Sequence, residues 1–290
     1  MHRLHHWLQR RAPRPQGPAR LVSMALGADR ATGRRMLDAS ARANRRFQAD
    51  HARLARSARA APPPLHWPGA TAWTRALQAD GRPLILATLH LGSYLSALLA
   101  LAGPLAWLER VTVFRHERDH PLEPAALAHF ARAGLHLELA RTREPPARQA
   151  LRALRSGGHL LLMHDVPPRF DVGRTLEVPF FGRGAHFATG PATLAWRTGA
   201  LLWPLALPRI DGRLTLRSMT PITVDAPSRI APATAALAAF AQRCIGEAPE
   251  QWLLWPHLDA FWAPSPHATA PRSRGPGATP ARARPDPTYT

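Results

Sequence analysis

The sequence predicts an α/β fold: a single domain with a mostly parallel central sheet flanked by helices, plus an N-terminal basic helical segment. Short apolar runs alternate with helical patterns from about residue 66 to residue 262, which is typical of parallel strands joined by helices. The chain has 290 residues, of which 46% are hydrophobic. That size suits one medium domain with a sizeable core better than two separate domains.

The N-terminal part is strongly basic. Residues 1–60 carry 14 arginines against three acidic residues, so they hold +11 of the net charge of +19. We expect residues 1–19 to form a loose basic tail and residues 20–60 a basic amphipathic helical segment. Such a segment can pack lightly on the domain, or lie on an anionic membrane with its arginines on phosphates, and the sequence leaves both open.

The elements after residue 66 follow from the spacing of apolar residues. Short apolar runs between polar or turn residues predict strands. These strands span 84–89, 111–115, 135–139, 159–164, 201–207 and 213–218. Segments with apolar residues at helical spacing predict helices. These helices span 93–101, 123–133, 146–156, 186–198 and 231–247.

One uncharged stretch is long enough to cross a membrane. Residues 83–108 carry no formal charge apart from His90. Turn residues at Gly92-Ser93 and Gly103-Pro104 divide this stretch into a short strand and a helix. We therefore expect no membrane span here.

Composition excludes several kinds of chemistry. All 38 basic residues are arginine, so no lysine can form a Schiff base. The single Cys244 cannot form an internal disulfide and is expected to be a buried structural thiol.

Residues 1–18 lack the apolar core of a signal peptide. Residues 263–290 are rich in proline and arginine, which predicts a disordered tail.

His90 is the first candidate for catalysis. It follows a predicted buried strand and precedes Gly92 and a helix. The carboxyl ends of parallel strands face the ligand crevice of an α/β sheet. A histidine there can act as general base on a hydroxyl or an amine. A lone histidine can equally be a satisfied core residue.

Five blocks in chain order place His90 in a wider pattern. They are Leu86-Ala87-Thr88-Leu89-His90; Val113-Phe114-Arg115 with Asp119-His120-Pro121-Leu122; Leu160-Leu161-Leu162-Met163-His164-Asp165; Val178-Pro179-Phe180-Phe181-Gly182 with Thr189-Gly190-Pro191-Ala192 and Trp196-Arg197-Thr198-Gly199-Ala200; and Pro249-Glu250-Gln251-Trp252. Over roughly residues 80–262 this order resembles the lipid A late acyltransferases (lauroyl and myristoyl acyltransferases) of the lysophospholipid acyltransferase superfamily.

The resemblance implies a catalytic histidine followed, after four residues, by Asp or Glu. Here the histidine is His90, and the position of the acid is occupied by Leu95. A leucine cannot accept a hydrogen bond from the imidazole. Disabling the orienting Asp of a serine protease lowers the rate by about 10⁴ while the fold stays intact. Activity therefore requires another group in place of the acid.

Several residues can replace the missing acid. Asp165 ends a neighbouring predicted strand and is the favoured candidate. It can alternatively pair with Arg169 or Arg115 and shape the site. The remaining candidates are the carboxylates of Glu117 and Asp119 and, more weakly, the hydroxyls of Ser93 and Tyr94.

Other residues are expected to bind substrate. Arg115 and Arg169 follow predicted strand ends, and a guanidinium suits the phosphate of acyl-CoA, of a carrier-bound pantetheine or of a phospholipid. Backbone amides near Gly92 are expected to stabilise an oxyanion. The turn at Phe180, Phe181 and Gly182 can line an acyl channel, although aromatic residues in such places are often plain core.

Together these features predict an acyltransferase that needs no metal or cofactor. It would move a fatty acyl group from acyl-carrier protein or acyl-CoA to a hydroxyl or amine of a lipid-like acceptor, with His90 as base. The alternative is a non-catalytic relative that binds acyl chains or lipids. Nucleic acid is not an expected partner, because the basic ends lack interleaved aromatic residues.

The expected location follows from one further departure from the family. The lipid A enzymes usually begin with a hydrophobic membrane helix, and this sequence shows none. We therefore expect a peripheral protein on the cytoplasmic face of the bacterial inner membrane, held by arginines on an anionic surface.

Overall fold

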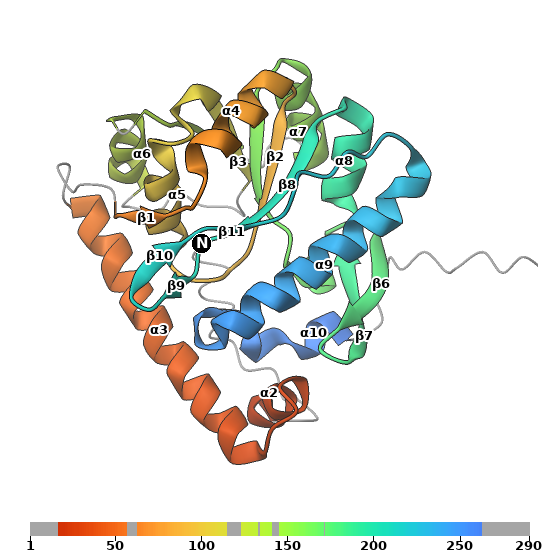
Figure 1. Cartoon of the computed structure of the whole chain (residues 1–290). Helices are drawn as coiled ribbons and strands as arrows, with labels where there is room; N and C mark the ends of the chain where they lie inside the picture. The colour runs from red at the N-terminus through yellow and green to blue at the C-terminus, as the bar shows by residue number, and fades with distance from the viewer. Residues whose placement is uncertain are drawn as a thin grey trace, which may run out of the picture.

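A six-stranded sheet lies at the centre of the described residues (Figure 1). The structure, a computed structural model, describes residues 17–56, 63–114, 123–132, 134–140, 145–170 and 172–262. The strands are β2 (Leu84–Thr88), β3 (Arg110–Phe114), β4 (His136–Ala140), β5 (His159–Met163), β8 (Leu201–Ala206) and β11 (Arg217–Ser218). Their order is β11-β8-β2-β5-β3-β4, and the pairs are parallel except for β11 with β8. This agrees with the predicted α/β class and its mostly parallel sheet.

Helices cover both faces of this sheet. They are α4 (Ala70–Asp80), α5 (Tyr94–Ala102), α6 (Glu123–Arg132), α7 (Pro146–Arg155), α8 (Gly190–Thr198) and α9 (Ile230–Glu247). Five of them lie close to the predicted positions. Helix α4 is not predicted from the sequence, because Leu77 is its buried residue and its apolar face is correspondingly narrow.

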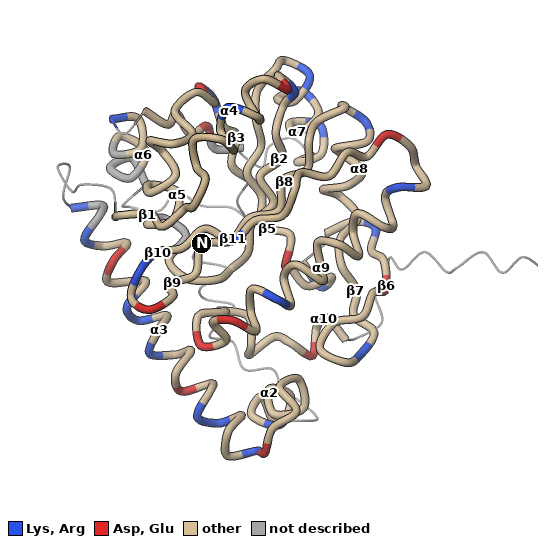
Figure 2. The backbone as a smooth tube through the Cα atoms, in the orientation of Figure 1, with Lys and Arg blue, Asp and Glu red and all other residues tan. Residues whose placement is uncertain are grey.

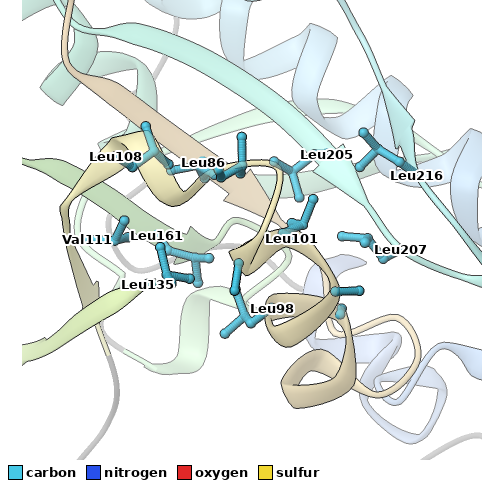
Figure 3. Close-up of a cluster of buried hydrophobic side chains, with 14 of the residues drawn as sticks. Leu86, Leu98, Leu101, Leu108, Val111, Leu135, Leu161, Leu205, Leu207 and Leu216 are labelled. Atoms are coloured by element: carbon cyan, nitrogen blue, oxygen red, sulfur yellow. The ribbon is translucent and has the colours of Figure 1, made fainter. Parts of the chain in front are cut away.

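Strand β2 shows why its sequence is apolar throughout. Leu84 and Leu86 belong to the cluster that contains α5 (Figure 3), whereas Ile85 and Ala87 pack with α7, α8 and α9. Side chains alternate between the two faces of a strand, so a strand covered on both faces reads as one continuous apolar run. All four side chains are at most 2% exposed.

Two helices occupy the predicted N-terminal helical segment. They are α2 (Pro18–Ala25) and α3 (Arg30–Arg56), which crosses one edge of the molecule (Figure 1). Gly27 between them has φ +60°, which glycine adopts without steric cost. The Asp29 carboxylate then accepts a hydrogen bond from the Thr32 amide at 2.6 Å, which satisfies a free donor at the start of α3.

A β-hairpin was missed by the sequence reasoning. It pairs β6 (Thr175–Phe180) with β7 (Arg183–Ala188), and the helix predicted from residue 186 begins only at Gly190. The strand predicted at 213–218 is also divided. Its first part, β10 (Arg213–Thr215), pairs with β1 (Leu65–His66) and β9 (Arg209–Ile210), and its second part is β11.

The C-terminal part runs through short helices to α10 (Asp259–Trp262). The predicted tail at 263–290 and most of the tail at 1–19 lie outside the described residues. Among the helices that the structure describes, none is both long and apolar enough to span a bilayer.

Candidate active site

His90 and Asp165 meet at the carboxyl edge of the sheet. Strands β2 and β5 are parallel neighbours in which Thr88 pairs with Met163, and the two candidate residues each follow two positions later. The His90 Nδ1 lies 2.8 Å from Asp165 Oδ1. The His90 backbone amide also donates to this carboxylate, at 2.9 Å to Oδ2 and 3.1 Å to Oδ1. The carboxylate therefore holds both the ring and the backbone of His90.

The pair is almost completely enclosed. Asp165 is 0% exposed and His90 is 8% exposed. Burial acts to raise the pKa of Asp165, but the His90 charge and hydrogen bond, His164 and the Trp252 hydrogen bond outweigh it, so the pKa lies below its ordinary value. Asp165 is therefore ionised at neutral pH and accepts the Nδ1–H proton, which leaves Nε2 as the basic nitrogen.

A segment from the end of the domain completes the pair. Residues 249–253, called the C-terminal strap below, lie against the turn that follows β2. The Gly92 amide donates to the Gln251 carbonyl at 3.0 Å, and the Leu253 amide donates to the His90 carbonyl at 3.0 Å. The Trp252 indole Nε1–H donates to Asp165 Oδ2 at 2.9 Å. Trp252 belongs to the last of the five blocks in the sequence, where no local pattern indicates this contact.

Gly92 is required by the geometry of this turn. Its φ is +76°, and a Cβ atom there would lie 3.3 Å from the Leu207 carbonyl oxygen and 3.5 Å from Gln251 Oε1. A side chain would therefore strain the backbone and push against the strap. The Gly92 amide is already bonded to Gln251, so any oxyanion must find its donors elsewhere.

The predicted acyl-channel residues form an aromatic cluster around Trp252. Phe180 is fully buried, and its ring centroid lies 6.0 Å from that of Trp252 and 4.6 Å from that of Phe181. Phe181 and Gly182 form the hairpin turn with φ of +51° and +71°. A positive φ is strained for a bulky residue. The Phe181 amide donates to Gln242 Oε1 at 2.5 Å, and its ring lies 5.4 Å from Trp255.

The two predicted arginines lie in different situations. The Arg169 guanidinium donates to His257 Nδ1 at 2.6 Å and lies over the Phe170 ring, 5.6 Å from its centroid. Arg115 lies outside the described residues, as do Glu117 and Asp119.

The remaining candidates for the missing acid are on α5. The Ser93 hydroxyl donates to the Ser96 hydroxyl at 2.9 Å, so it is engaged within its own helix. Tyr94 and Leu95 are in the first turn of α5, but their side chains lie outside the described part of the structure. Among the candidates that the structure describes, Asp165 alone hydrogen-bonds to the His90 ring.

His164 precedes Asp165 in the third of the five blocks, and the sequence predicts no functional role for it. It is 3% exposed, and neither ring nitrogen has a hydrogen-bond partner among the described residues. Burial lowers the pKa of His164 to about 4, opposed by Asp165 and reinforced by His90. The ring is therefore neutral at physiological pH.

Other features of the described residues do not enlarge this site. Cavities of about 480 and 360 Å³ lie beside α6 and beside the β9–β10 hairpin, and neither is lined by His90 or Asp165. The described residues contain no group of three or more His, Cys, Asp or Glu side chains placed to hold a metal. Burial raises the pKa of the Cys244 thiol to about 12, so it is a poor nucleophile.

The comparison with known families agrees with this geometry. An imidazole–carboxylate pair at a strand end can remove a proton from an acceptor hydroxyl or amine. Among proteins of curated function, none is similar enough in sequence to be matched. The sequence model of the bacterial lipid A biosynthesis acyltransferases matches residues 74–257, which is more than half of the 290-residue chain. The matched region contains the His90–Asp165 pair and the C-terminal strap, and the chain belongs to this family of acyltransferases.

Proposed function

We propose that this protein moves a fatty acyl group from an acyl thioester to a hydroxyl or amine of a lipid-like acceptor. The donor thioester is acyl-CoA or an acyl group bound to acyl-carrier protein. His90 acts as general base, and Asp165 takes the place of the acid that Leu95 cannot supply. The observation that carries this proposal is the 2.8 Å contact between His90 Nδ1 and Asp165 Oδ1 in a buried site.

The proposed reaction has two proton transfers. His90 Nε2 removes the proton of the acceptor hydroxyl or amine as that group attacks the thioester carbonyl carbon. The tetrahedral intermediate then collapses, the carbon–sulfur bond breaks, and the leaving thiolate takes the proton from Nε2. Asp165 holds Nδ1–H throughout and stabilises the imidazolium between the two steps, as the Asp of a serine-protease triad does.

Substrate contacts are assigned around this pair. The oxyanion is stabilised by backbone amides in the first turn of α5, which have no partner four residues earlier within the helix. Arg169 and Arg115 contact phosphate of the donor or acceptor. Phe180, Phe181 and Gly182 form an aromatic wall beside the acyl chain, with Phe180 as its buried support.

The direct test is acyl transfer by the purified protein with acyl-CoA and with acyl-carrier protein. We expect His90→Ala and Asp165→Asn each to lower kcat/KM by about 10³–10⁴, because one removes the base and the other its orienting charge. His136→Ala and Asp225→Asn change the same residue types at exposed positions and are expected to retain activity. If the wild-type protein and His90→Ala are equally inert with every donor while acyl chains still bind, the non-catalytic alternative replaces this proposal.

We also propose that the protein is peripheral on the cytoplasmic face of the inner membrane, held on anionic lipid by α3. All eight arginines of α3 are exposed, and basic residues follow the helix along its length (Figure 2). Exposed arginines near an anionic leaflet are attracted to it. Met24 lies in α2, the helix that precedes α3. Its large apolar side chain is 45% exposed and can enter the membrane–water interface.

A further inference from the structure

The Asp165 carboxylate depends on a donor from a distant part of the chain. Asp165 is fully buried, so water does not solvate its charge. Oδ1 accepts from His90 Nδ1 and from the His90 amide. Oδ2 accepts from the same amide, at 2.9 Å, and from Trp252 Nε1–H, also at 2.9 Å. Without the indole, Oδ2 would retain only an amide that it shares with Oδ1.

The Trp252 ring is fixed in the position that this contact needs. It is 0% exposed, and the centroids of Trp255 and Phe261 lie 4.8 Å and 5.9 Å from its own. The Trp252 backbone is fixed as well, because its carbonyl accepts a hydrogen bond from the Ser40 hydroxyl of α3 at 3.0 Å. The indole cannot turn away from Oδ2 without disturbing this packing.

The chemistry of the indole matters as much as its position. An indole N–H donates and cannot accept a hydrogen bond, so it favours a charged carboxylate at Asp165. It also draws electron density toward Oδ2, which moderates the attraction between Oδ1 and the imidazole proton. A base whose proton is held too strongly stays protonated at neutral pH and cannot begin the reaction.

We propose that Trp252 is a positioning residue for the His90–Asp165 pair, fixing the orientation of the Asp165 carboxylate and limiting how strongly it attracts the His90 proton. This inference rests on the proposed function of the pair. Two of the sequence blocks meet here, because Phe180 and Phe181 pack against the Trp252 ring, whose N–H donates to Asp165.

The test is Trp252→Phe, which keeps an aromatic ring in the cluster and removes the N–H donor. We expect kcat to fall about tenfold to hundredfold. We also expect the pH at which activity is lost on the acidic side to move upward, because the less well solvated carboxylate binds the imidazole proton more tightly. Asp165→Asn removes the charge and is expected to move the same limb downward. A purely structural role would change the rate and leave this limb where it is.

Trp203→Phe is the matched control. Trp203 is also 0% exposed, but within the described ranges its Nε1–H has no hydrogen-bond partner, and its ring packs on Trp67 and Trp73. We expect its pH profile to match that of the wild type. If Trp252→Phe and Trp203→Phe give the same rate and the same acidic limb, Trp252 has no positioning role.

A second measurement separates this inference from the proposed activity. In ¹⁵N-labelled protein, one of the nine tryptophan Nε1–H signals should shift relative to the wild type both in His90→Ala and in Asp165→Asn. This readout needs no turnover and no Trp252 variant that folds. If it is observed while no donor is consumed, the positioning role holds and the proposed function fails. If all nine signals ignore both changes, the positioning role fails.

Discussion

Two neighbouring residues that follow β5 are both buried, but one side chain is charged and the other is neutral. Asp165 has its carboxylate surrounded by donors, so its charged form is stable despite complete burial. His164, one position earlier, has two buried ring nitrogens that find no hydrogen-bond partner in the part of the chain that the structure describes. Burial without a partner disfavours the charged form of a histidine and lowers its pKa. The pH dependence of stability is therefore expected to depend on His164 in one window and on Asp165 in another.

The direction in which stability changes with pH at His164 follows from its pKa in the folded and in the unfolded chain. Its pKa is about 4 when folded and about 6.5 in an unfolded chain. Between these values the unfolded chain binds a proton that the folded protein does not, so stability falls as the pH drops from about 6.5 to about 4. The loss is about 1.4 kcal/mol per pH unit, or on the order of 3 kcal/mol over the window. For Asp165 the folded pKa is depressed, so its contribution is lost only at lower pH.

The variant His164→Phe tests this at the residue scale. A ring without nitrogen atoms removes both the titration and the unpaired polar atoms. We expect urea unfolding at pH 7 and at pH 5 to give more similar free energies in the variant than in the wild-type protein. Equal pH dependence in the two proteins would mean that His164 does not stay neutral on folding.

At the scale of elements, the site depends on the turn after β2 and on the C-terminal strap, which are joined by hydrogen bonds. Residues 90–92 exchange backbone hydrogen bonds with the C-terminal strap, with Leu91 and Trp252 bridged in antiparallel fashion. Gln251 adds its side chain, which accepts from the Arg209 amide at 2.9 Å and donates to the Arg209 carbonyl at 2.8 Å. The turn, the strap and the start of β9 are therefore one connected unit.

Gly92→Ala is expected to disturb this unit. Its φ of +76° disfavours alanine by about 1–2 kcal/mol, and the new Cβ presses on the Leu207 carbonyl. We expect lower stability and, in the fraction that folds, activity lower by about tenfold or more, because His90 is displaced. Gly81→Ala is the control, since Gly81 has φ +71° at the end of α4 with open space around it. It should lose similar stability in thermal melts and keep its activity. Equal activity in the two variants would contradict a role for the turn in placing His90.

The sequence predicts those parts of this arrangement that depend on local patterns. The central strands β2, β5 and β8 are nearly continuous apolar runs, and the ends of β2 and β5 place His90 and Asp165 at one edge. A turn is expected at Phe180-Phe181-Gly182, but the two strands that flank it were missed, because Phe181 occupies a position where a two-residue hairpin turn normally has Asn, Asp or Gly. The hydrogen bond from Trp252 to Asp165 joins residues 87 apart, and no local pattern encodes it. Its one signal was the presence of Trp252 in a block that resembles the family.

At the scale of the whole molecule, charge is concentrated on α3. This helix carries eight arginines against Asp38 and Asp50, and basic residues are visible along its length (Figure 2). The buried side of α3 packs against the short helices near the strap, so one helix carries the arginine face and also contacts the surroundings of the candidate site. Binding of α3 to a membrane would place the protein at the source of lipid acceptors.

Sedimentation with vesicles tests this at the molecular scale. We expect the protein to bind vesicles of phosphatidylcholine with phosphatidylglycerol, and not of phosphatidylcholine alone. The combined change Arg42→Gln, Arg45→Gln and Arg46→Gln should weaken binding about hundredfold, since each arginine contributes about 1 kcal/mol near an anionic surface. The same change at Arg148, Arg152 and Arg155 of α7 removes equal charge elsewhere and serves as control. Equal loss in both triple variants would indicate attraction by net charge without a defined face.

The position of the strap near the end of the domain has a consequence for the order of events in folding. Asp165 receives two donors from a residue 75 positions before it and a third from a residue 87 positions after it. During synthesis the N-terminal part of a chain emerges first, and contacts between distant residues form slowly. The buried carboxylate therefore lacks its third donor until residues 249–253 have left the ribosome and docked. The His90–Asp165 pair is thus among the last features of the molecule to mature, and a nascent chain can contain both residues before it contains a finished site.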